Sequence, residues 1–377
     1  MGYKVDNLGT SMPQPRRQSP DIRHFILMNV TAFPDTIGTL TAAKFGVSRT
    51  TVSNYISRLI DEGLLTARGN TRARRYERKI IASETITVKL TKDTAEDMIW
   101  RFKVLPLLHA NNKNVVDICQ YGFTEILNNC VDHSVSDTAM IAVNIYYDEI
   151  EIRIYDSGVG IFEKIRSHFG LVDHRHALLE LTKGKITSDS ERHSGEGIFF
   201  TSRMFNKFFI NSGHLFYSRE MKFDDDWLIE TDDIATPTRG SAVGMTIATS
   251  ATWSPRDVFE KYQESGNISF RKTHVPIKLG RYPGEQLVSR SQAKRIISRF
   301  GSFSEVILDF AGIDQIGQAF ADEIFRVFPT EHPEISLLSV RTCDDVAKMI
   351  AYVRSASRQE SDGNTFFSLG LMRSDSD

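Results

Sequence analysis

The chain has 377 residues, of which 41% are hydrophobic, 25% charged and 10% aromatic. This mixture suits two or three globular domains and excludes wholesale disorder, a collagen-like chain or a small disulfide scaffold. The sequence has no run of about 18 apolar residues and no apolar signal-peptide core, so we expect a cytoplasmic protein without membrane contact. Residues 1–80 carry 13 Lys and Arg against 6 Asp and Glu, a net +7, whereas the whole chain carries −2, which leaves −9 for the remainder. We therefore expect only this basic N-terminal part to meet a polyanion.

Polarity and periodicity divide the chain into six segments. The proline-containing start, 1–20, is predicted to be a flexible arm, and 357–377 a polar tail. Between them we expect three domains and a charged helical connector. The domains are 21–83, 84–252 and 274–356, and the connector is 253–273.

The first domain shows helical patterns separated by a turn. Gly46 marks the turn, and Ser48 is the candidate N-cap of the next helix. Val52, Ile56 and Leu59 form the apolar face of that helix. Polar and basic residues on its other faces are candidates for contacts in a DNA groove: Arg49, Thr50, Ser53, Asn54 and Arg58.

Two short extended stretches around Gly69 and Asn70 follow this helix and are dense in arginine. Helix, turn, helix and basic hairpin together resemble the winged-helix DNA-binding domains over about the first 80 residues. The resemblance implies that four arginines of the wing meet DNA phosphates. These are Arg68, Arg72, Arg74 and Arg75. The alternative is a winged helix used for protein contacts, with the arginines as a solvated face.

The segment 84–252 mixes strand and helix patterns. A strand at 84–90 and a long helix at 93–108, interrupted by Pro106, precede the other elements. A helix is predicted at 114–134, and a hairpin of two alternating strands at 140–147 and 150–158. The stretch 161–194 is predicted to be long and irregular. We expect an α+β layer whose strands are covered by helices on one face.

Three polar residues share one face of the helix at 114–134. Glu125, Asn129 and Asp132 stand at i, i+4 and i+7. An amide and phosphate oxygens can ligate Mg²⁺, and a neighbouring carboxylate can polarise a water for attack on a phosphorus atom. Taken alone, these residues would be interpreted as a solvated helix face.

An aspartate at the end of a predicted strand and two pairs of glycines indicate a binding site instead. Asp156 ends a predicted strand, where it can accept a hydrogen bond from an exocyclic amine, and Gly158 and Gly160 leave room for a flat ring. Gly195 and Gly197 open a helix whose free N–H groups suit phosphate oxygens.

This order of motifs resembles the GHKL ATP-binding fold of gyrase, MutL and the histidine kinases. Glu125, Asn129 and Asp132 match its N-box, Asp156, Gly158 and Gly160 its first glycine box, and Gly195 and Gly197 its second. The resemblance implies ATP and Mg²⁺ as cofactors. It also implies Glu125 as the general base, Asn129 as the Mg²⁺ ligand and Asp156 as the acceptor for the adenine amino group.

By the same resemblance, 161–194 would be the ATP lid. Four of its residues would reach the phosphates: Lys183, Lys185, His193 and Ser194. For the closing Thr/Ser motif, both Gly240-Ser241 and Gly244-Thr246 fit, and Thr246 is carried as an ATP contact. No upstream helix pair carries a phosphoacceptor His, so histidine kinase activity is not expected.

The last domain alternates strands and helices, which predicts a small α/β unit with a mixed sheet. Residues 306–328 resemble the STAS-like DUF4325 module. STAS domains are partners of anti-sigma-type GHKL serine kinases, which phosphorylate a serine in the turn before the helix. The matching turn, 316–320, has no hydroxyl side chain. We therefore expect this unit to be a surface for a protein partner rather than a phosphoacceptor.

The sequence thus predicts a multi-domain protein: an α winged helix-turn-helix, an α+β GHKL sandwich and a small α/β STAS-like domain. Its expected function is an ATP-binding regulator in which Mg-ATP binding or slow hydrolysis controls a DNA-binding head. Because pairing is common among GHKL proteins, a homodimer is one expected assembly. Two alternatives remain: an anti-sigma-type serine kinase acting on a separate STAS partner, and a non-catalytic ATP-sensing scaffold.

Overall fold

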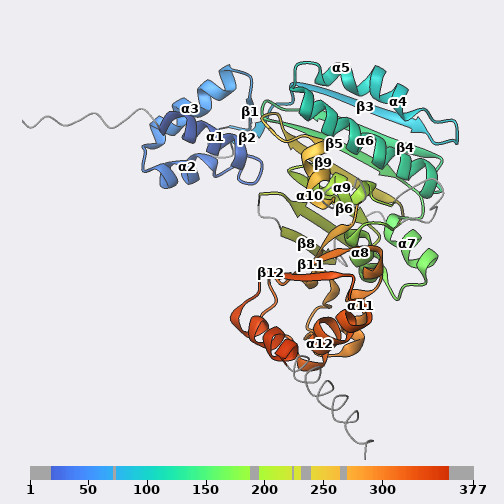
Figure 1. Cartoon of the computed structure of the whole chain (residues 1–377). Helices are drawn as coiled ribbons and strands as arrows, with labels where there is room; N and C mark the ends of the chain where they lie inside the picture. The colour runs from blue at the N-terminus through green and yellow to red at the C-terminus, as the bar shows by residue number, and fades with distance from the viewer. Residues whose placement is uncertain are drawn as a thin grey trace, which may run out of the picture. The chain divides into compact units, whose positions relative to one another are not determined.

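The computed structural model describes residues 18–70, 74–186, 195–222, 225–230, 239–263 and 270–355. The chain forms two compact units, the first comprising Met1–Ser83 with Asn144–Tyr147 and the second Glu84–Val143 with Asp148–Asp377. The architecture is multi-domain, with a large antiparallel sheet and a small C-terminal α/β domain, both in the second unit (Figure 1). Three predicted site residues, Arg72, His193 and Ser194, lie outside the described residues.

In its described residues, the first unit contains three helices and a two-stranded antiparallel sheet. The helices are α1 (Gln18–Asn29), α2 (Ile37–Phe45) and α3 (Arg49–Asp61), and the strands are β1 (Leu65–Arg68) and β2 (Arg75–Arg78). Gly46 ends α2 with a left-handed φ of 63°, and the Ser48 hydroxyl caps α3 by accepting from the Thr51 N–H at 3.1 Å. Both sequence predictions are confirmed. Ile26, Ile37 and Ile56 are among the residues of its apolar core.

A seven-stranded sheet with the order β3-β4-β5-β9-β6-β7-β8 is the centre of the second unit. Antiparallel pairing joins β5 to β9, β9 to β6, β6 to β7 and β7 to β8. Exposure alternates along β4 and β6, because one face of the sheet is covered and successive side chains point to opposite faces. The strands are β3 (Ala82–Lys89), β4 (Thr138–Ile145), β5 (Glu149–Asp156), β6 (Lys207–Ser212), β7 (Leu215–Glu220), β8 (Asp225–Glu230) and β9 (Ser241–Ala248).

Helix α6 (Lys113–His133) packs on β5 and β9 and against α9 (Gly197–Met204). The helix predicted at 93–108 is broken into α4 (Glu96–Ile99), a π-helical turn η2 (Trp100–Val104) and α5 (Leu105–Leu108). Beyond the sheet, α10 (Pro255–Tyr262) lies in the predicted connector and packs its Phe259 ring 4.7 Å from that of Phe200. This helix is therefore part of the aromatic packing of the domain.

The prediction of a long irregular stretch at 161–194 is wrong for its described part. It contains α7 (Ile161–Phe169) and α8 (His174–Lys183). The N-terminus of α7 is held by a distant partner, since the Ile161 N–H donates to Ser241 Oγ at 2.9 Å. The Asp173 side chain caps α8 by accepting from the His176 N–H at 2.9 Å. A stabilising contact across 80 residues leaves no local signal in the sequence.

The C-terminal domain has a three-stranded sheet in the order β10-β11-β12. Its strands, β10 (Lys272–Pro276), β11 (Glu305–Asp309) and β12 (Ser336–Val340), are parallel, so the predicted mixed sheet is wrong. Helices cover it: α11 (Arg290–Ile297), α12 (Gln318–Asp322) continued by η5 (Glu323–Val327) and α13 (Phe328–Glu331), and residues 344–355. The turns η3 (Ile277–Gly280) and η4 (Phe300–Ser302) connect them. Within the described residues, no helix combines the length and apolar character needed to cross a membrane.

Candidate functional site: a pocket beside the sheet

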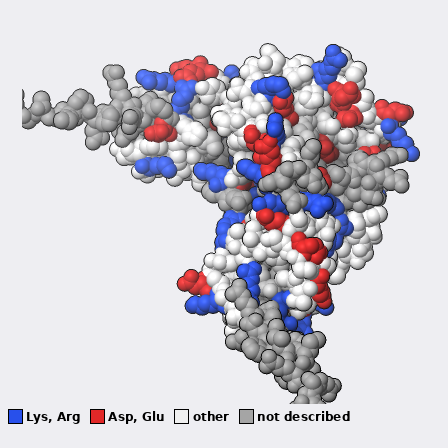
Figure 2. Space-filling view, in the orientation of Figure 1, with Lys and Arg blue, Asp and Glu red and all other residues white. Residues whose placement is uncertain are grey.

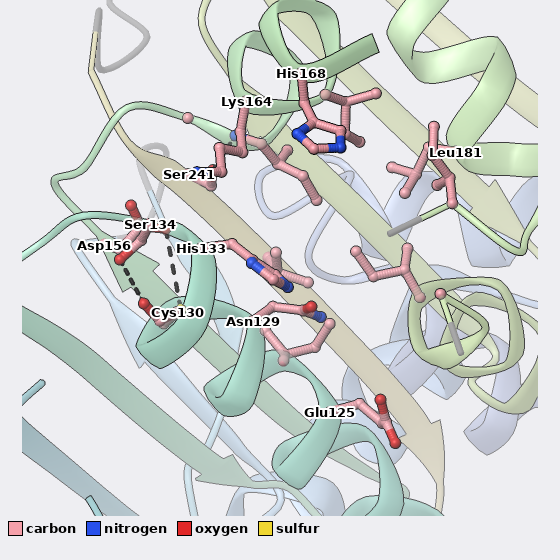
Figure 3. Close-up of a pocket in the computed structure, with 18 of the residues that line it drawn as sticks. Glu125, Asn129, Cys130, His133, Ser134, Asp156, Lys164, His168, Leu181 and Ser241 are labelled. Atoms are coloured by element: carbon pink, nitrogen blue, oxygen red, sulfur yellow. Dashed lines mark hydrogen bonds between the residues drawn. The ribbon is translucent and has the colours of Figure 1, made fainter. Parts of the chain in front are cut away.

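A pocket of about 240 Å³ lies beside the covered face of the seven-stranded sheet (Figure 3). Its polar lining comes mainly from four elements, α6, β5, α7 and β9, which the fold brings together. Helix α6 contributes Glu125, Asn129 and His133, and the end of β5 contributes Asp156. Helix α7 and β9 form the facing wall, with Lys164, His168 and Ser241, and Ile161, Leu181 and Val243 belong to its apolar lining.

The helical repeat decides which residues of α6 enter the pocket. At about 100° per residue, Asn129 follows Glu125 by a little more than one turn, and His133 follows Asn129 in the same way. All three line the pocket, whereas Asp132 is exposed and lies outside its lining. Asp132, predicted as an ATP contact, is therefore not a lining residue, whereas its neighbour His133 is. The opposite face of α6 is buried through Val115, Cys119 and Phe123.

Asp156 is held at the end of β5 by the turn that follows it. Its Oδ1 accepts from the Gly158 N–H at 2.9 Å, and the Cys130 thiol lies 4.0 Å from Oδ2. Burial raises the pKa of the Asp156 carboxyl, although the N–H groups of Gly158 and Ser241 act in the opposite direction. A Cβ at Gly158 would lie 1.8 Å from the Ser134 carbonyl oxygen, so only glycine fits there. The aspartate is therefore a partly desolvated acceptor in a fixed position.

The second pair of glycines lies at the other end of the pocket. Gly195 lines it, and Gly197 begins α9. A Cβ at Gly197 would lie 1.9 Å from Glu125 Oε2, so the missing side chain lets the N-terminus of α9 approach the Glu125 carboxylate. Exposed N–H groups at a helix start favour negative charge. This end of the pocket therefore combines a carboxylate with N–H donors.

Lys183 and Lys185 do not reach the pocket, contrary to prediction. The buried Lys183 ammonium donates to Glu180 at 2.6 Å and to the Ser298 carbonyl at 2.9 Å. Lys185 donates to the Ser302 carbonyl at 2.7 Å. The physical reason is that α8 packs against β10 and η3 of the C-terminal domain, which supplies carbonyl oxygens for these cations.

Thr246 does not line the pocket either. Side chains alternate along β9, and Ser241 and Val243 are the ones in the pocket wall, so Thr246 points to the other face of the sheet. Of the two motifs that the sequence left open, the structure brings Gly240-Ser241 to the pocket. Ser241 Oγ accepts from the first N–H of α7 and lies 3.3 Å from Ser212 Oγ.

Sequence reasoning missed Lys164 and His168. They stand at i and i+4 on α7, in register with Ile161 and Ile165, and all four line the pocket. The helical spacing of these four residues is the sequence signal that indicates a shared helix face. The prediction of an irregular lid for 161–194 did not make use of it. Among the described residues, no cluster of three or more His, Cys, Asp and Glu side chains could hold a metal ion.

In the first unit, the predicted DNA-contacting residues of α3 form an exposed face: Arg49, Thr50, Ser53, Asn54 and Arg58. Figure 2 shows Lys and Arg alongside Asp and Glu on the visible side of this unit. Two arginines of the β1–β2 hairpin have acidic partners. Arg68 lies 3.1 Å from Glu77, and Arg75 forms a bidentate pair with Asp35 at 2.7 and 3.0 Å. Arg74 is exposed near the Tyr76 ring.

Arg75, predicted as a phosphate contact, is thus paired with an acidic residue of its own unit. Both of its bonded nitrogens are committed to Asp35, which precedes α2 by two residues. A bidentate pair of this kind fixes the hairpin to the helical part of the unit. The partner lies 40 residues away, so local sequence could not reveal it.

Comparison with known proteins gives one result for part of the chain. Residues 292–347 match a family described as a STAS-like domain of unknown function (DUF4325). The match runs from α11 past β12, within the C-terminal domain. No curated protein matches the chain.

Proposed function

We propose that the chain is an ATP-responsive regulator whose pocket is a GHKL-type Mg-ATP site and whose first unit is a winged helix that binds DNA. One observation carries the nucleotide assignment. Glu125 and Asn129 of α6 line the same pocket as Asp156 of β5, with glycine at both ends. A fixed acceptor at one end and helix N–H donors at the other suit a ligand with an amino-purine and a polyanionic chain.

Three pocket residues and the start of α9 then have roles. Asp156 accepts from the amino group of adenine, and the start of α9 meets the phosphate chain. Asn129 would hold Mg²⁺ through its side-chain oxygen, and the metal would neutralise charge on the phosphates. Glu125, beside the start of α9, orients a water and takes its proton as the water attacks the terminal phosphorus and ADP leaves. The products are ADP and inorganic phosphate.

Helix α8 provides a path from this pocket to the STAS-like domain. Leu181 lines the pocket, while Lys183, two residues further on, donates to the Ser298 carbonyl of the C-terminal domain. The Thr273 hydroxyl of β10 donates to the Lys183 carbonyl at 2.6 Å, and the Arg175 guanidinium donates to the Arg281 carbonyl at 2.7 Å. A ligand that favours one position of α8 would change how the STAS-like domain is held, which is the requirement for linkage.

Glu125→Ala tests the enzymatic part of the proposal. The variant should still bind Mg-ATP but release inorganic phosphate at least about 100-fold more slowly, because a positioned general base contributes that much or more. Phosphate release and nucleotide affinity are measured on the full chain. Glu331→Ala, an exposed change in α13, is the control with the same charge difference.

Hydrolysis by Glu125→Ala at the wild-type rate would exclude Glu125 as the base. If wild-type protein moved the labelled γ-phosphate to another protein instead of to water, the chain would be a serine kinase.

If the first unit binds DNA as proposed, its affinity for duplex DNA should depend on salt concentration. Arg49→Ala with Arg58→Ala should weaken binding to duplex DNA and reduce the slope of log K against log salt by roughly 0.9 for each lost phosphate contact. Both guanidinium groups belong to the exposed face of α3. Arg101→Ala with Lys103→Ala, both exposed on η2 in the second unit, is the matched control. Equal slopes for wild type and the double variant would show that α3 does not contact phosphates.

A further inference from the structure

Lys164 is a cation in the pocket wall to which none of the roles above applies. It belongs to α7 and lines the pocket near its neighbour one turn on, His168. Figure 3 places both residues on the wall that faces His133 and Asn129 of α6. An ammonium group at this position faces the side chain that would hold Mg²⁺ under the proposed function.

The acidic neighbour of Lys164 is already engaged. Glu163 accepts from Arg166 at 2.8 Å, from the Ser167 hydroxyl at 2.6 Å and lies 2.8 Å from His174 Nε2. These partners hold the pKa of Glu163 well below its usual range, so it is a carboxylate directed to them. Within the ranges that the structure describes, the Lys164 ammonium has neither a hydrogen-bond nor an ion-pair partner. Its charge is therefore available to a ligand.

Lys164 is also the one lysine or arginine in the pocket lining that the structure describes. Lys183 and Lys185, the lysines expected to hold phosphates, donate to backbone carbonyls of the C-terminal domain. A nucleotide with three phosphate groups would otherwise meet two carboxylates, Glu125 and Asp156, without a side-chain cation. Charge balance in a partly closed pocket favours an anion beside Lys164.

We propose that Lys164 binds the phosphate chain of the nucleotide from α7 and makes the pocket selective for phosphorylated adenosine over adenosine. This inference rests on the proposed function, because it takes the ligand to be an adenine nucleotide. Lys164 is a specificity residue in this account, with no part in proton transfer. Its ammonium donates hydrogen bonds to phosphate oxygens across the pocket from Asn129.

The test measures the affinities of ATP and adenosine for the full-length chain and for Lys164→Ala. A lost hydrogen bond between charged groups should weaken ATP binding about 10- to 100-fold. Adenosine affinity should change less than about twofold, which also shows that the variant is folded. Lys164→Arg should restore most of the ATP affinity because it keeps the charge. Lys113→Ala, an exposed lysine at the start of α6, should behave as wild type.

Other outcomes overturn the inference in distinguishable ways. Wild-type ATP affinity in Lys164→Ala refutes the role of Lys164 and leaves the proposed function intact. Equal losses of affinity for ATP and adenosine would show that Lys164 supports the structure of the pocket and does not contact the phosphate chain. If the wild-type chain binds neither ligand, the proposed function fails, and the role of Lys164 fails with it.

Discussion

Asp156→Asn should weaken ATP binding at least about 100-fold while the chain stays folded. The substitution keeps one oxygen, which can still accept from the Gly158 N–H. It replaces the other oxygen with an NH₂ group that opposes the amino group of adenine, so an acceptor is lost and two donors face each other. Losing a hydrogen bond and leaving buried donors unpaired together cost about 3 kcal/mol or more, which corresponds to this factor.

Calorimetry and thermal unfolding separate the two effects of this substitution. Asp137→Asn, an exposed change in the loop before β4, is the control for removing one negative charge. Because burial raises the pKa of Asp156, the neutral variant should unfold no more easily than wild type. Unchanged ATP affinity in a folded Asp156→Asn variant would contradict the adenine assignment.

Glu180→Leu should be the most destabilising of the substitutions considered. Glu180 and Lys183 are each only 1% exposed and form an ion pair of 2.6 Å, and Glu180 also lies 3.6 Å from both His176 and Arg299. Removing the carboxylate leaves a buried ammonium whose remaining hydrogen-bond acceptor, among the described residues, is the Ser298 carbonyl. Breaking such a pair costs about 3–5 kcal/mol, or roughly 6–20 °C in Tm for a domain of this size.

A double variant distinguishes lost charge pairing from lost packing. Glu180→Leu with Lys183→Met removes both charges and should recover much of the loss, because an apolar pair of similar volume avoids desolvation. Equal Tm values for the single and double variants would contradict the pairing. Burial alone would raise the pKa of Glu180. Lys183 and His176 lower it by more than burial raises it, so the folded-state pKa of Glu180 is below the ordinary value. Its contribution to stability is therefore present above the ordinary pKa and lost as the pH falls through the lower folded-state value.

Local patterns were enough to predict α6 and β5, two of the elements that form the pocket. The apolar period of 114–134 corresponds to α6, and the alternation at 140–147 and 150–158 corresponds to β4 and β5. The positions of Gly46 and Ser48 also followed from turn and cap preferences. The STAS-like resemblance at 306–328 lies within the matched residues 292–347. Each of these signals is contained within a few helical turns or one strand.

Side-chain direction could not be predicted where a distant segment decides it. Lys183 and Lys185 turn to carbonyls at 298 and 302, more than 110 residues away, because α8 packs between the pocket and the C-terminal domain. Arg75 turns to Asp35 in the same way. The prediction for Thr246 failed for another reason. Because side chains alternate along β9, Ser241 and Thr246 point to opposite faces of the sheet. Only the register of β9 with β5 and β6 shows which face is covered.

We propose that the pocket formed by α6, α7 and the ends of β5 and β9 binds Mg-ATP. Isothermal titration of Mg-ATP into the full-length chain tests this binding most directly. We expect a saturable heat with one site per chain, greatly weakened by Asp156→Asn and unaffected by Asp137→Asn. The absence of saturable heat with folded wild-type protein would contradict it, and so would an unchanged isotherm for Asp156→Asn.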